Sequence, residues 1–355
     1  MEASRKSTSA AHGDECGVRK IAILGAGSCG TALAVALARS RQPHKLSLWV
    51  HGSDVLGTLR ATRENSVYLP GIRIREQVQV TGEMGEALAE AEIVLGVMPA
   101  AHARAIYTAA LPFIDPQAAS RIIFVSATKG LEEDSFERMT EVIADVTRPL
   151  FVPRVAVLSG PSFALEIARG DPTAVVIASG DPAVAAAVQE EFSGPTLRFY
   201  TNNDTIGVEM GGAVKNVIAI AAGVCVGLGL GANTIAALIT RGLAEMTRLA
   251  VAMGGRRDTL AGLAGLGDLV LTATGALSRN RSLGVELGKG RPLADVLAGT
   301  RMVAEGVGTT AATLALARKN GIEMPITEQM DAVLHRGRAP GDAIRELMDR
   351  RLKQE

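Results

Sequence analysis

The chain has 355 residues, which is long enough for two domains that each bury a core of their own. Hydrophobic residues make up 47% and charged residues 21%, and the formal net charge is zero, as in a compact protein rather than a polyelectrolyte. Aromatic residues account for only 3%, so the stacking surfaces and basic stripe typical of nucleic-acid binding are not indicated.

The N-terminus and the cysteines set further bounds. Residues 1–18 hold no apolar core of signal-peptide length, and we interpret them as a disordered tail. Cys16, Cys29 and Cys225 form no CxxC pair, which fits a reducing compartment, so we expect a cytoplasmic protein without disulfides. We find no HxH, CxxC or carboxylate cluster that would bind a metal, and none is expected.

A glycine-rich turn follows the first expected strand, Lys20–Leu24. The turn reads Gly-Ala-Gly-Ser-Cys-Gly over residues 25–30 and leads into an alanine-rich helix. In this context GxGxxG predicts dinucleotide binding. Gly25 allows the tight turn, Gly27 lets a pyrophosphate approach, and Gly30 lets the helix pack on the strand. The phosphates would lie at the helix N-terminus, held by free backbone N–H groups and the helix dipole.

The second expected strand, Lys45–Val50, bears on the choice of dinucleotide. A site selective for NAD usually carries an acid at the end of this strand, where it binds the ribose 2′-hydroxyl. Here the first acid after the strand is Asp54, several residues late, so a 2′-phosphate should be tolerated and either NAD(H) or NADP(H) fits. His51 is a plausible neighbour of that phosphate; a solvent-exposed loop histidine is the alternative.

Strands and helices alternate as far as about residue 204, which predicts a parallel, doubly wound sheet, an α/β domain of the Rossmann type. Further strands are expected at Val78–Thr81, Glu92–Val97, Arg121–Val125, Arg154–Leu158, Thr173–Ala178 and Leu197–Thr201, and helices at Met84–Ala91, His102–Leu111 and Pro182–Phe192. Strand ends of such a sheet face the ligand crevice, so Lys129 is a candidate cation there. The alternative is a surface lysine before a glycine turn.

From Thr205 onward no convincing strand is seen, and apolar helical runs are broken by glycines. We therefore expect residues 19–204 to form the dinucleotide-binding domain and residues 205–355 an all-α domain for substrate and catalysis. Its last expected helices, which we interpret as structural, are Thr309–Lys319, Ile326–His335 and Gly341–Arg350.

The helix expected at Glu209–Leu230 opens that second domain and is almost wholly small or apolar. A buried ammonium is costly because desolvation disfavours its charged form. Lys215, next to Asn216 and preceded by two glycines, therefore suggests a general acid or a clamp on a substrate oxygen. The alternative is a lysine that snorkels to water. The run Val217–Ala232 is too short and too glycine-rich for a confident membrane span, so we predict a core helix.

The segment at residues 262–281 adds an acid and an anion site. Asp268 stands among Gly, Leu and Val and needs a partner if buried, and Lys215 is a physically sensible one. Ser278 is a good N-cap for a helix that starts with Arg279 and Asn280, and such a helix N-terminus suits a small phosphate. An exposed capped helix with a solvated arginine is the alternative.

At this point the chain resembles the NAD(P)-dependent glycerol-3-phosphate dehydrogenases of bacteria over about residues 19–350. Four separated blocks carry the resemblance: GAGSCGTALA at 25–34, GPSFALEIARGDPTA at 160–174, EMGGAVKNVIAIAAG at 209–223 and GLAGLGDLVLTATGALSRNRSLG at 262–284. The stretch AALITRGLAEMTRL at 236–249 and the VAEGV turn at 303–307 add to it.

The resemblance implies roles for individual residues. Lys215 would be the catalytic proton donor and acceptor, with Asp268 and Lys129 beside it. The glycerol phosphate would be lined by Lys129, Gly160, Ser162, Lys215, Asp268, Ser278, Arg279 and Asn280. The dinucleotide would contact Ser28, Cys29, His51, Lys129, Ala164, Arg279, Val303 and Glu305. The family usually has an aromatic residue where this chain has Cys29, which changes the side-chain packing expected against the cofactor.

The reaction that the resemblance implies agrees with the chemistry inferred from the residues alone. Reduction of dihydroxyacetone phosphate needs a hydride at the carbonyl carbon, which NAD(P)H supplies, and a proton on its oxygen, which Lys215 would give. The product, sn-glycerol 3-phosphate, would feed glycerophospholipid synthesis. Two rivals remain: a related hydroxy-acid dehydrogenase of the same architecture, and a nucleotide-sensing protein without chemistry. A homodimer is one assembly that we consider, although no residue pattern requires it.

Overall fold

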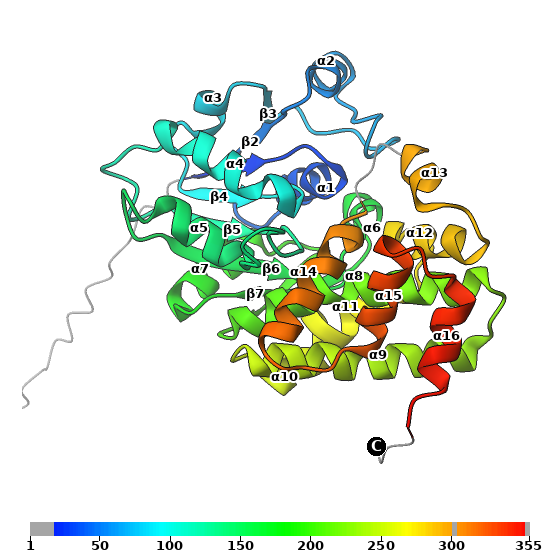
Figure 1. The fold of residues 1–355 in the computed structure, drawn as a ribbon. Helices are drawn as coiled ribbons and strands as arrows, with labels where there is room; N and C mark the ends of the chain where they lie inside the picture. Colours follow the sequence, from blue (N-terminus) through cyan, green and yellow to red (C-terminus); the bar gives the residue numbers. More distant parts are fainter. Residues whose placement is uncertain (1–17, 300–303, 352–355) are drawn as a thin grey trace, which may run out of the picture.

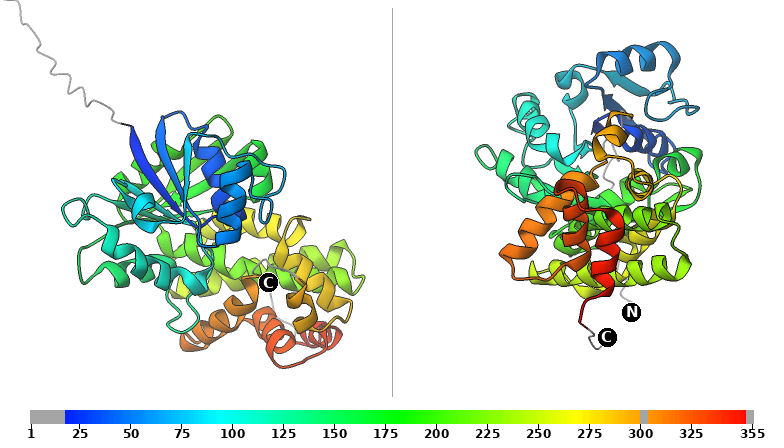
Figure 2. Two further views of the ribbon diagram at one scale, coloured as in Figure 1. Left: turned by 90° about the horizontal axis from the view of Figure 1, so that it is seen from above. Right: turned by 45° about the vertical axis from the view of Figure 1, so that its right-hand side comes forward.

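The computed structural model describes residues 18–299 and 304–351 of the chain. A sheet with helices on both faces makes up the N-terminal part, and helices alone make up the described C-terminal part. In Figure 1 the sheet-bearing part lies above the helical part, and the turned views of Figure 2 show the same two-part arrangement. This is the predicted fold class, a Rossmann-type domain followed by a helical region.

The sheet has eight strands in the order β3-β2-β1-β4-β5-β6-β7-β8. Their bounds are β1 Arg19–Leu24, β2 His44–Trp49, β3 Val78–Thr81, β4 Ile93–Gly96, β5 Ile123–Ser126, β6 Arg154–Ser159, β7 Thr173–Ala178 and β8 Leu197–Asn202. Strands β1 to β6 pair in parallel, and the order reverses between β1 and β4, where a doubly wound sheet binds its ligand.

One sequence-based expectation about the sheet is wrong: it is not parallel throughout. β7 runs antiparallel to β6 and parallel to β8. The connection from β6 to β7 contains only the six-residue helix α6, Ala164–Arg169. A helix of that length spans about 9 Å, whereas a six-residue strand spans about 20 Å, so α6 cannot carry the chain back along the sheet. The chain instead turns round and re-enters the sheet beside β6.

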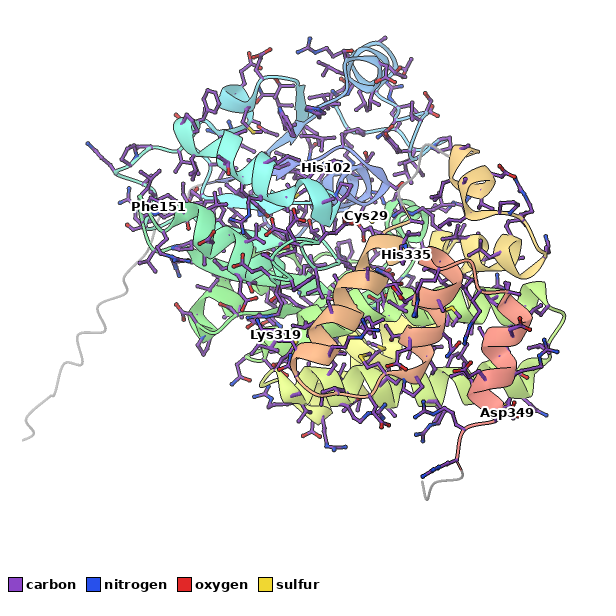
Figure 3. The ribbon with its side chains drawn as sticks, viewed as in Figure 1. Cys29, His102, Phe151, Lys319, His335 and Asp349 are labelled. Carbon is purple, nitrogen blue, oxygen red and sulfur yellow. The ribbon has the colours of Figure 1, made fainter. Side chains whose placement is uncertain are left out.

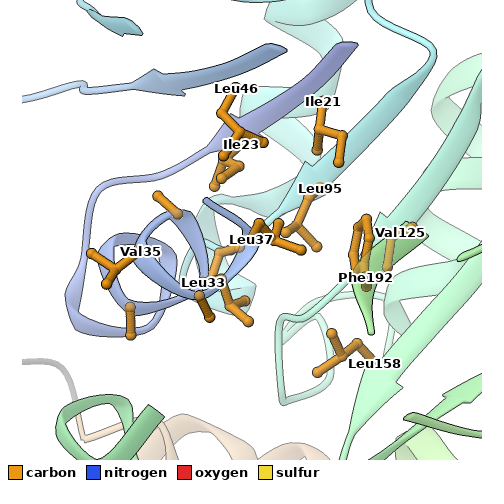
Figure 4. Packing of buried hydrophobic residues seen from close by; sticks show 14 of the residues in the cluster. Ile21, Ile23, Leu33, Val35, Leu37, Leu46, Leu95, Val125, Leu158 and Phe192 are labelled. Atoms are coloured by element: carbon orange, nitrogen blue, oxygen red, sulfur yellow. The ribbon is translucent and has the colours of Figure 1, made fainter. Parts of the chain in front are cut away.

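Side-chain alternation along the strands gives the sheet two buried faces. Ile21 and Ile23 of β1 join one apolar cluster with the inner face of α1, and Ala22 and Leu24 join another on the opposite face. Figure 4 shows the first cluster, where strand residues pack against Leu33 and Leu37 of α1.

The helices of the sheet-bearing part are α1 Ser28–Leu37, α2 Ser53–Thr62, α3 Met84–Leu88, α4 Ala100–Ala110, α5 Met139–Thr147, α6 and α7 Pro182–Phe192, with a 3-10 turn η1 at Leu111–Phe113.

The helical part is built around α8, Thr205–Gly227, which is buried from Gly207 to Cys225. The other elements are α9 Ala232–Ala252, α10 Arg257–Ala261, the helical turn η2 Leu263–Gly267, α11 Asp268–Thr274, α12 Arg279–Gly288, α13 Leu293–Ala298, α14 Gly306–Lys319, α15 Pro325–His335 and α16 Pro340–Met348. In Figure 1, α9 runs beside α8, and α14 and α15 pack across α8. The expected helices of this region match α8, α14, α15 and α16 to within a few residues at each end.

α8 is a core helix, as the sequence predicted. Among the described residues it is the one helix long and apolar enough to span a membrane by length and composition, and 89% of its most apolar window is buried inside the protein. Glycines allow its close packing on α12: a Cβ on Gly223 would overlap the Arg281 carbonyl, and one on Gly284 would overlap the Ile220 carbonyl. The first helical residue, Thr205, stands where we expect the second domain to begin; the division into two domains stays a prediction.

Candidate active site

The glycine-rich turn at residues 25–30 has the geometry of a pyrophosphate cradle. Gly25 has a φ of 117°, in the region that favours glycine, and a Cβ there would overlap the Val97 carbonyl. A Cβ on Gly30 would overlap the Gly25 carbonyl, so only glycine lets α1 pack so closely on the turn. A Cβ on Gly27 would meet nothing within 4 Å, so its missing side chain leaves open space. Glycine thus serves a different structural purpose at each of these three positions.

The N-terminus of α1 is ready to receive an anion. Gly27 is its N-cap residue, and no side chain in the described ranges bonds to its first-turn N–H groups. The Thr31 N–H already donates to the Gly27 carbonyl, which leaves the N–H groups of Ser28, Cys29 and Gly30 outside the helix ladder. Free N–H groups and the positive end of a helix dipole are what a pyrophosphate needs.

The end of β2 offers no carboxylate between Trp49 and Ser53. The exposed His51 ring lies against Trp49, with 5.6 Å between ring centroids. The Trp49 indole in turn donates to the Gly82 carbonyl at 3.0 Å, which fixes the platform on which His51 rests. His51 is therefore held beside the strand end where the adenosine ribose of a dinucleotide lies in this fold.

Four side chains from three distant parts of the sequence meet at the C-terminal edge of the sheet. Asp268, at the start of α11, is 1% exposed, and its carboxylate accepts from two lysines. Lys129, after β5, donates to its Oδ2 at 2.7 Å, and Lys215 of α8 donates to its Oδ1. Lys215 also donates to Thr272 Oγ1 at 2.9 Å. The expected pairing of Lys215 with Asp268 is confirmed, and neither lysine is a freely solvated surface group.

The sequence did not predict two features of this cluster. One is the sharing of Asp268 between both lysines. The other is Thr272, one helical turn after Asp268, whose hydroxyl donates to the Asp268 carbonyl at 2.6 Å and accepts from Lys215. The i,i+4 spacing of the two residues within a short apolar helix was the available signal.

Lys129 connects this cluster to the turn after β6. Its Nζ donates to the Gly160 carbonyl at 3.0 Å and to Ser162 Oγ at 3.2 Å, so the predicted group of Lys129, Gly160, Ser162, Lys215 and Asp268 is contiguous. Gly160 has a φ of 132°, and the Ser162 hydroxyl donates to its carbonyl at 2.8 Å. The strand end, the turn and α11 together hold the Lys129 ammonium in one place.

Charge and burial set the protonation of the cluster. Burial lowers the pKa of Lys215 to about 8; the Asp268 carboxylate opposes this shift, and the Lys129 ammonium adds to it. Burial also disfavours the charged form of Lys129, but the Asp268 carboxylate outweighs this effect and raises the pKa of Lys129. Burial alone would raise the pKa of Asp268, but the two lysines hold it below its usual range. A lysine with a pKa near neutrality is suited to give and take a proton.

The second group of predicted residues lies on α12 and at the start of α14. Ser278 caps α12 by accepting from the Arg281 N–H at 3.2 Å, as expected, and Arg279 is exposed at the first turn. The Asn280 amide oxygen accepts from the Gly306 N–H at 3.1 Å. Asn280 therefore links α12 to α14, a structural role that the sequence did not indicate.

Glu305 ties this second group to the lysines. Burial raises its pKa to about 7, against the charges of Arg279, Lys129 and Lys215, all of which are near enough to act on it. The Glu305 carboxylate is thus influenced by positive charges from both groups. The neighbouring Val303, also predicted to contact the cofactor, lies outside the described residues.

The remaining predicted residues lie at the start of α1 and of α6, which packs against it. Ser28 Oγ donates to the Tyr68 carbonyl at 2.8 Å, and Ala164 begins α6. Cys29 is exposed near the start of α1 and close enough to Lys129 to act on its pKa. In the view of Figure 3 Cys29 lies between the ribbons of α1 and α14. The Val97 carbonyl lies against Gly25 of the cradle. The next residue, Met98, is hydrogen-bonded to Thr128 beside Lys129, so the cradle and the lysine cluster are neighbours.

The site contains the parts that a dinucleotide-dependent dehydrogenase needs: a glycine-rich cradle for a pyrophosphate, and two lysines on one buried carboxylate at the adjoining edge of the sheet. No group of three or more His, Cys, Asp and Glu side chains able to hold a metal occurs in residues 18–299 and 304–351. The residues at the cradle fit a nicotinamide dinucleotide, since Gly27 leaves open space and the α1 N–H groups are free.

Comparison with known proteins defines the family. The model of the NAD-dependent glycerol-3-phosphate dehydrogenase N-terminus matches residues 20–185, and that of its C-terminus matches residues 204–345. The chain belongs to this NAD(P)-dependent glycerol-3-phosphate dehydrogenase family.

Relatives cover nearly the whole chain. The chain is 57% identical to glycerol-3-phosphate dehydrogenase [NAD(P)+] of Koribacter versatilis over 332 residues, which is 93% of this chain and 97% of that one. It is 56% identical to the enzyme of the same description from Acidobacterium capsulatum, over 93% and 98% of the two chains. The crystal structure of glycerol-3-phosphate dehydrogenase from Coxiella burnetii is similar with a TM-score of 0.88 at 41% identity, covering 94% of this chain and 99% of that one.

Proposed function

We propose that the chain catalyses the reversible, NAD(P)H-dependent reduction of dihydroxyacetone phosphate to sn-glycerol 3-phosphate. One observation carries the proposal beyond the family: a buried carboxylate holds two lysines at the sheet edge next to the dinucleotide cradle. A ketone placed there meets a proton donor and a second cation at once. The product suits glycerophospholipid synthesis, and the reduced cysteines Cys29 and Cys225 suit a cytoplasmic location.

The chain's own residues account for the proton, the charge and the position of the substrate. When bound, the reduced nicotinamide supplies a hydride to the carbonyl carbon. The Lys215 ammonium donates to the carbonyl oxygen, gives it a proton as the hydride arrives, and is reprotonated from solvent. Lys129 adds positive charge beside that oxygen, where negative charge develops. Asp268 keeps both ammonium groups in place and opposes the effect of burial on Lys215.

The substrate's phosphate would be anchored at the N-terminus of α12. Among the described residues, the Ser278 hydroxyl accepts from the Arg281 N–H, and the N–H groups of Arg279 and Asn280 at the helix start have no partner in the helix ladder. The exposed Arg279 guanidinium adds a bidentate donor that matches a phosphate. Because the substrate is small, this anchor supplies much of the binding energy that positions its carbonyl.

The test is oxidation of NADPH or NADH on addition of dihydroxyacetone phosphate, followed by absorbance and by identification of the product. We expect turnover with this ketone and much less with unphosphorylated dihydroxyacetone. We also expect NADPH to serve at least as well as NADH, since β2 ends without a carboxylate. Turnover only with a 2-oxo acid would favour the hydroxy-acid dehydrogenase, and NADPH binding without turnover would favour the sensing protein. The predicted homodimer is tested separately by light scattering on the eluted protein.

A further inference from the structure

Asn65, in the segment between α2 and β3, is fully buried and reaches the glycine-rich turn. Its side-chain Nδ2 donates to the Ala26 carbonyl at 2.8 Å and to Thr31 Oγ1 at 2.8 Å. Its Oδ1 accepts from the Tyr68 N–H at 3.1 Å. Three of the four hydrogen-bonding positions of the amide are therefore used, and two of them hold the dinucleotide cradle.

The bond to Ala26 bears directly on the cradle because of the geometry of the peptide that it holds. Ala26 and Gly27 share one trans peptide, whose C=O and N–H point in opposite directions. A donor that fixes the Ala26 carbonyl toward Asn65 also fixes the Gly27 N–H away from it. The same carbonyl accepts from the Thr31 hydroxyl at 3.5 Å, so the peptide is held from two sides.

Without the Asn65 donor, the buried carbonyl would lose its main partner. An unsatisfied buried carbonyl is unfavourable, which favours rotation of the peptide toward another donor. Rotation would bring a carbonyl oxygen toward the space that Gly27 leaves open, where a pyrophosphate carries negative charge. Asn65 thus opposes a rearrangement that would turn the cradle from attractive to repulsive.

A second connection passes through the same asparagine. By accepting the Tyr68 N–H, Asn65 shapes the turn at residues 65–69, which the Leu69 N–H closes on the Asn65 carbonyl at 2.8 Å. That turn presents the Tyr68 carbonyl to Ser28 Oγ at 2.8 Å. The bonds to residues 26 and 28 hold the cradle at two of its positions, and the bond to Thr31 holds the residue that follows it.

We propose that Asn65 is a positioning residue for the dinucleotide: it touches the cradle and sets the affinity for the cofactor through the Ala26–Gly27 peptide. The proposal rests on the proposed function, because it takes the cradle to bind NAD(P)H. It predicts a split in the kinetics. Binding of NADPH weakens when the donor is lost, while turnover at saturating NADPH persists, because the lysine cluster lies on other elements.

Three variants separate the donor from the shape and from general stability. Asn65→Ala removes all three side-chain bonds. Asn65→Asp keeps the size and the acceptor for Tyr68 but replaces the Nδ2 donor by an oxygen. Gln77→Ala is the control for an amide bonded to α1 away from the cradle: the exposed Gln77 donates to the Ala38 carbonyl at 3.1 Å, at the opposite end of the helix.

The measurement is the dissociation constant of NADPH by calorimetric titration of each full-length variant, with kcat at saturating NADPH alongside. We expect Asn65→Ala and Asn65→Asp to bind about tenfold more weakly or worse, the usual scale for a buried hydrogen-bond partner left unsatisfied. Gln77→Ala should bind within about twofold of the wild type, and kcat should change little in every variant.

Several results would overturn the proposal. Equal affinities for Asn65→Ala and Gln77→Ala would show that the asparagine does not set the cradle. Normal binding by Asn65→Asp would show that shape, not the donor, matters. A loss confined to kcat would place the effect in the lysine cluster. Failure of the wild type to bind NADPH would instead contradict the proposed function, and with it this inference, so the two failures are distinguishable.

Discussion

At the scale of residues, the site depends on one carboxylate serving two ammonium groups. Asp268 is buried, and its oxygens are divided between Lys129 and Lys215. The sequence indicated the pair Lys215 and Asp268, because each is an isolated charge in an apolar segment that would need a partner if buried. It could not indicate the sharing with Lys129, which is 139 residues away and is brought close only by the sheet topology.

The effect of Asp268 on Lys215 gives a pH prediction. Asp268 opposes the lowering of the Lys215 pKa by burial, so Asp268→Asn should let that pKa fall below about 8. Since the donor must be protonated for ketone reduction, the variant should lose kcat at lower pH than the wild type does. The check is the alkaline limb of the pH profile of kcat at saturating substrates.

Thr272→Val is the matched control for that pH profile. It removes the hydroxyl that accepts from Lys215 but removes no charge, so its alkaline limb should move much less than that of Asp268→Asn. Identical limbs in the wild type and Asp268→Asn would mean that Asp268 does not govern the protonation of Lys215.

At the scale of elements, α8 carries both Lys215 and the group that fastens it to the sheet-bearing part. Glu209, in its second turn, accepts from the Arg138 guanidinium at 2.6 Å, the Thr140 N–H at 2.9 Å and the Thr140 hydroxyl at 2.6 Å. All three donors belong to the start of α5. Lys215 follows six residues later, about 9 Å along the helix, so this buried contact helps to fix where Lys215 stands relative to the sheet.

Glu209→Gln should therefore lower the free energy of unfolding by about 2 kcal/mol, because the buried Arg138 and the Thr140 donors lose a charged acceptor while Arg138 keeps its ion pair with Glu141. Urea unfolding at neutral pH measures this loss. The comparison variant is Glu286→Gln, whose carboxylate pairs with the exposed Lys289 and Arg291 and should cost less than about 1 kcal/mol. A loss below about 1 kcal/mol in Glu209→Gln would show that the contact between α8 and α5 contributes no more than an exposed ion pair.

The elements themselves show what local sequence can and cannot specify. Apolar β-branched runs placed all eight strands to within two residues, and glycine spacing placed the cradle, because these signals are local. The reversed direction of β7 was missed, since strand direction depends on how far α6 can carry the chain. The contact of Asn65 with the turn was also missed, because nothing near Asn65 in the sequence points to residues 26 and 31.

At the scale of the whole molecule, the site exists only where the sheet-bearing and helical parts meet. The cradle and Lys129 come from the first part, whereas Lys215, Asp268 and Arg279 come from the second. On the proposed function, the first part binds most of the dinucleotide and the second part positions the substrate.

This division predicts that a substitution can remove the phosphate anchor without disturbing the dinucleotide site. Arg279→Ala should lower kcat/KM for dihydroxyacetone phosphate by about 10- to 100-fold, the scale of a lost charged hydrogen bond, with little change for unphosphorylated dihydroxyacetone. Steady-state kinetics with both ketones measures the loss of preference. Arg281→Ala is the control, because residues two apart on a helix face different ways. If both ketones suffered equally, Arg279 would act on the cofactor or the fold rather than on the phosphate.

The central claim is that Lys215 gives the proton. Its most direct test is the kcat of Lys215→Met for NADPH oxidation with dihydroxyacetone phosphate, together with the dissociation constant of NADPH. The account predicts a kcat about 10²- to 10⁴-fold lower, as for loss of a general acid, with NADPH binding unchanged because the cradle lies on α1. Near-normal turnover in Lys215→Met would contradict the account and would move the proton transfer to Lys129.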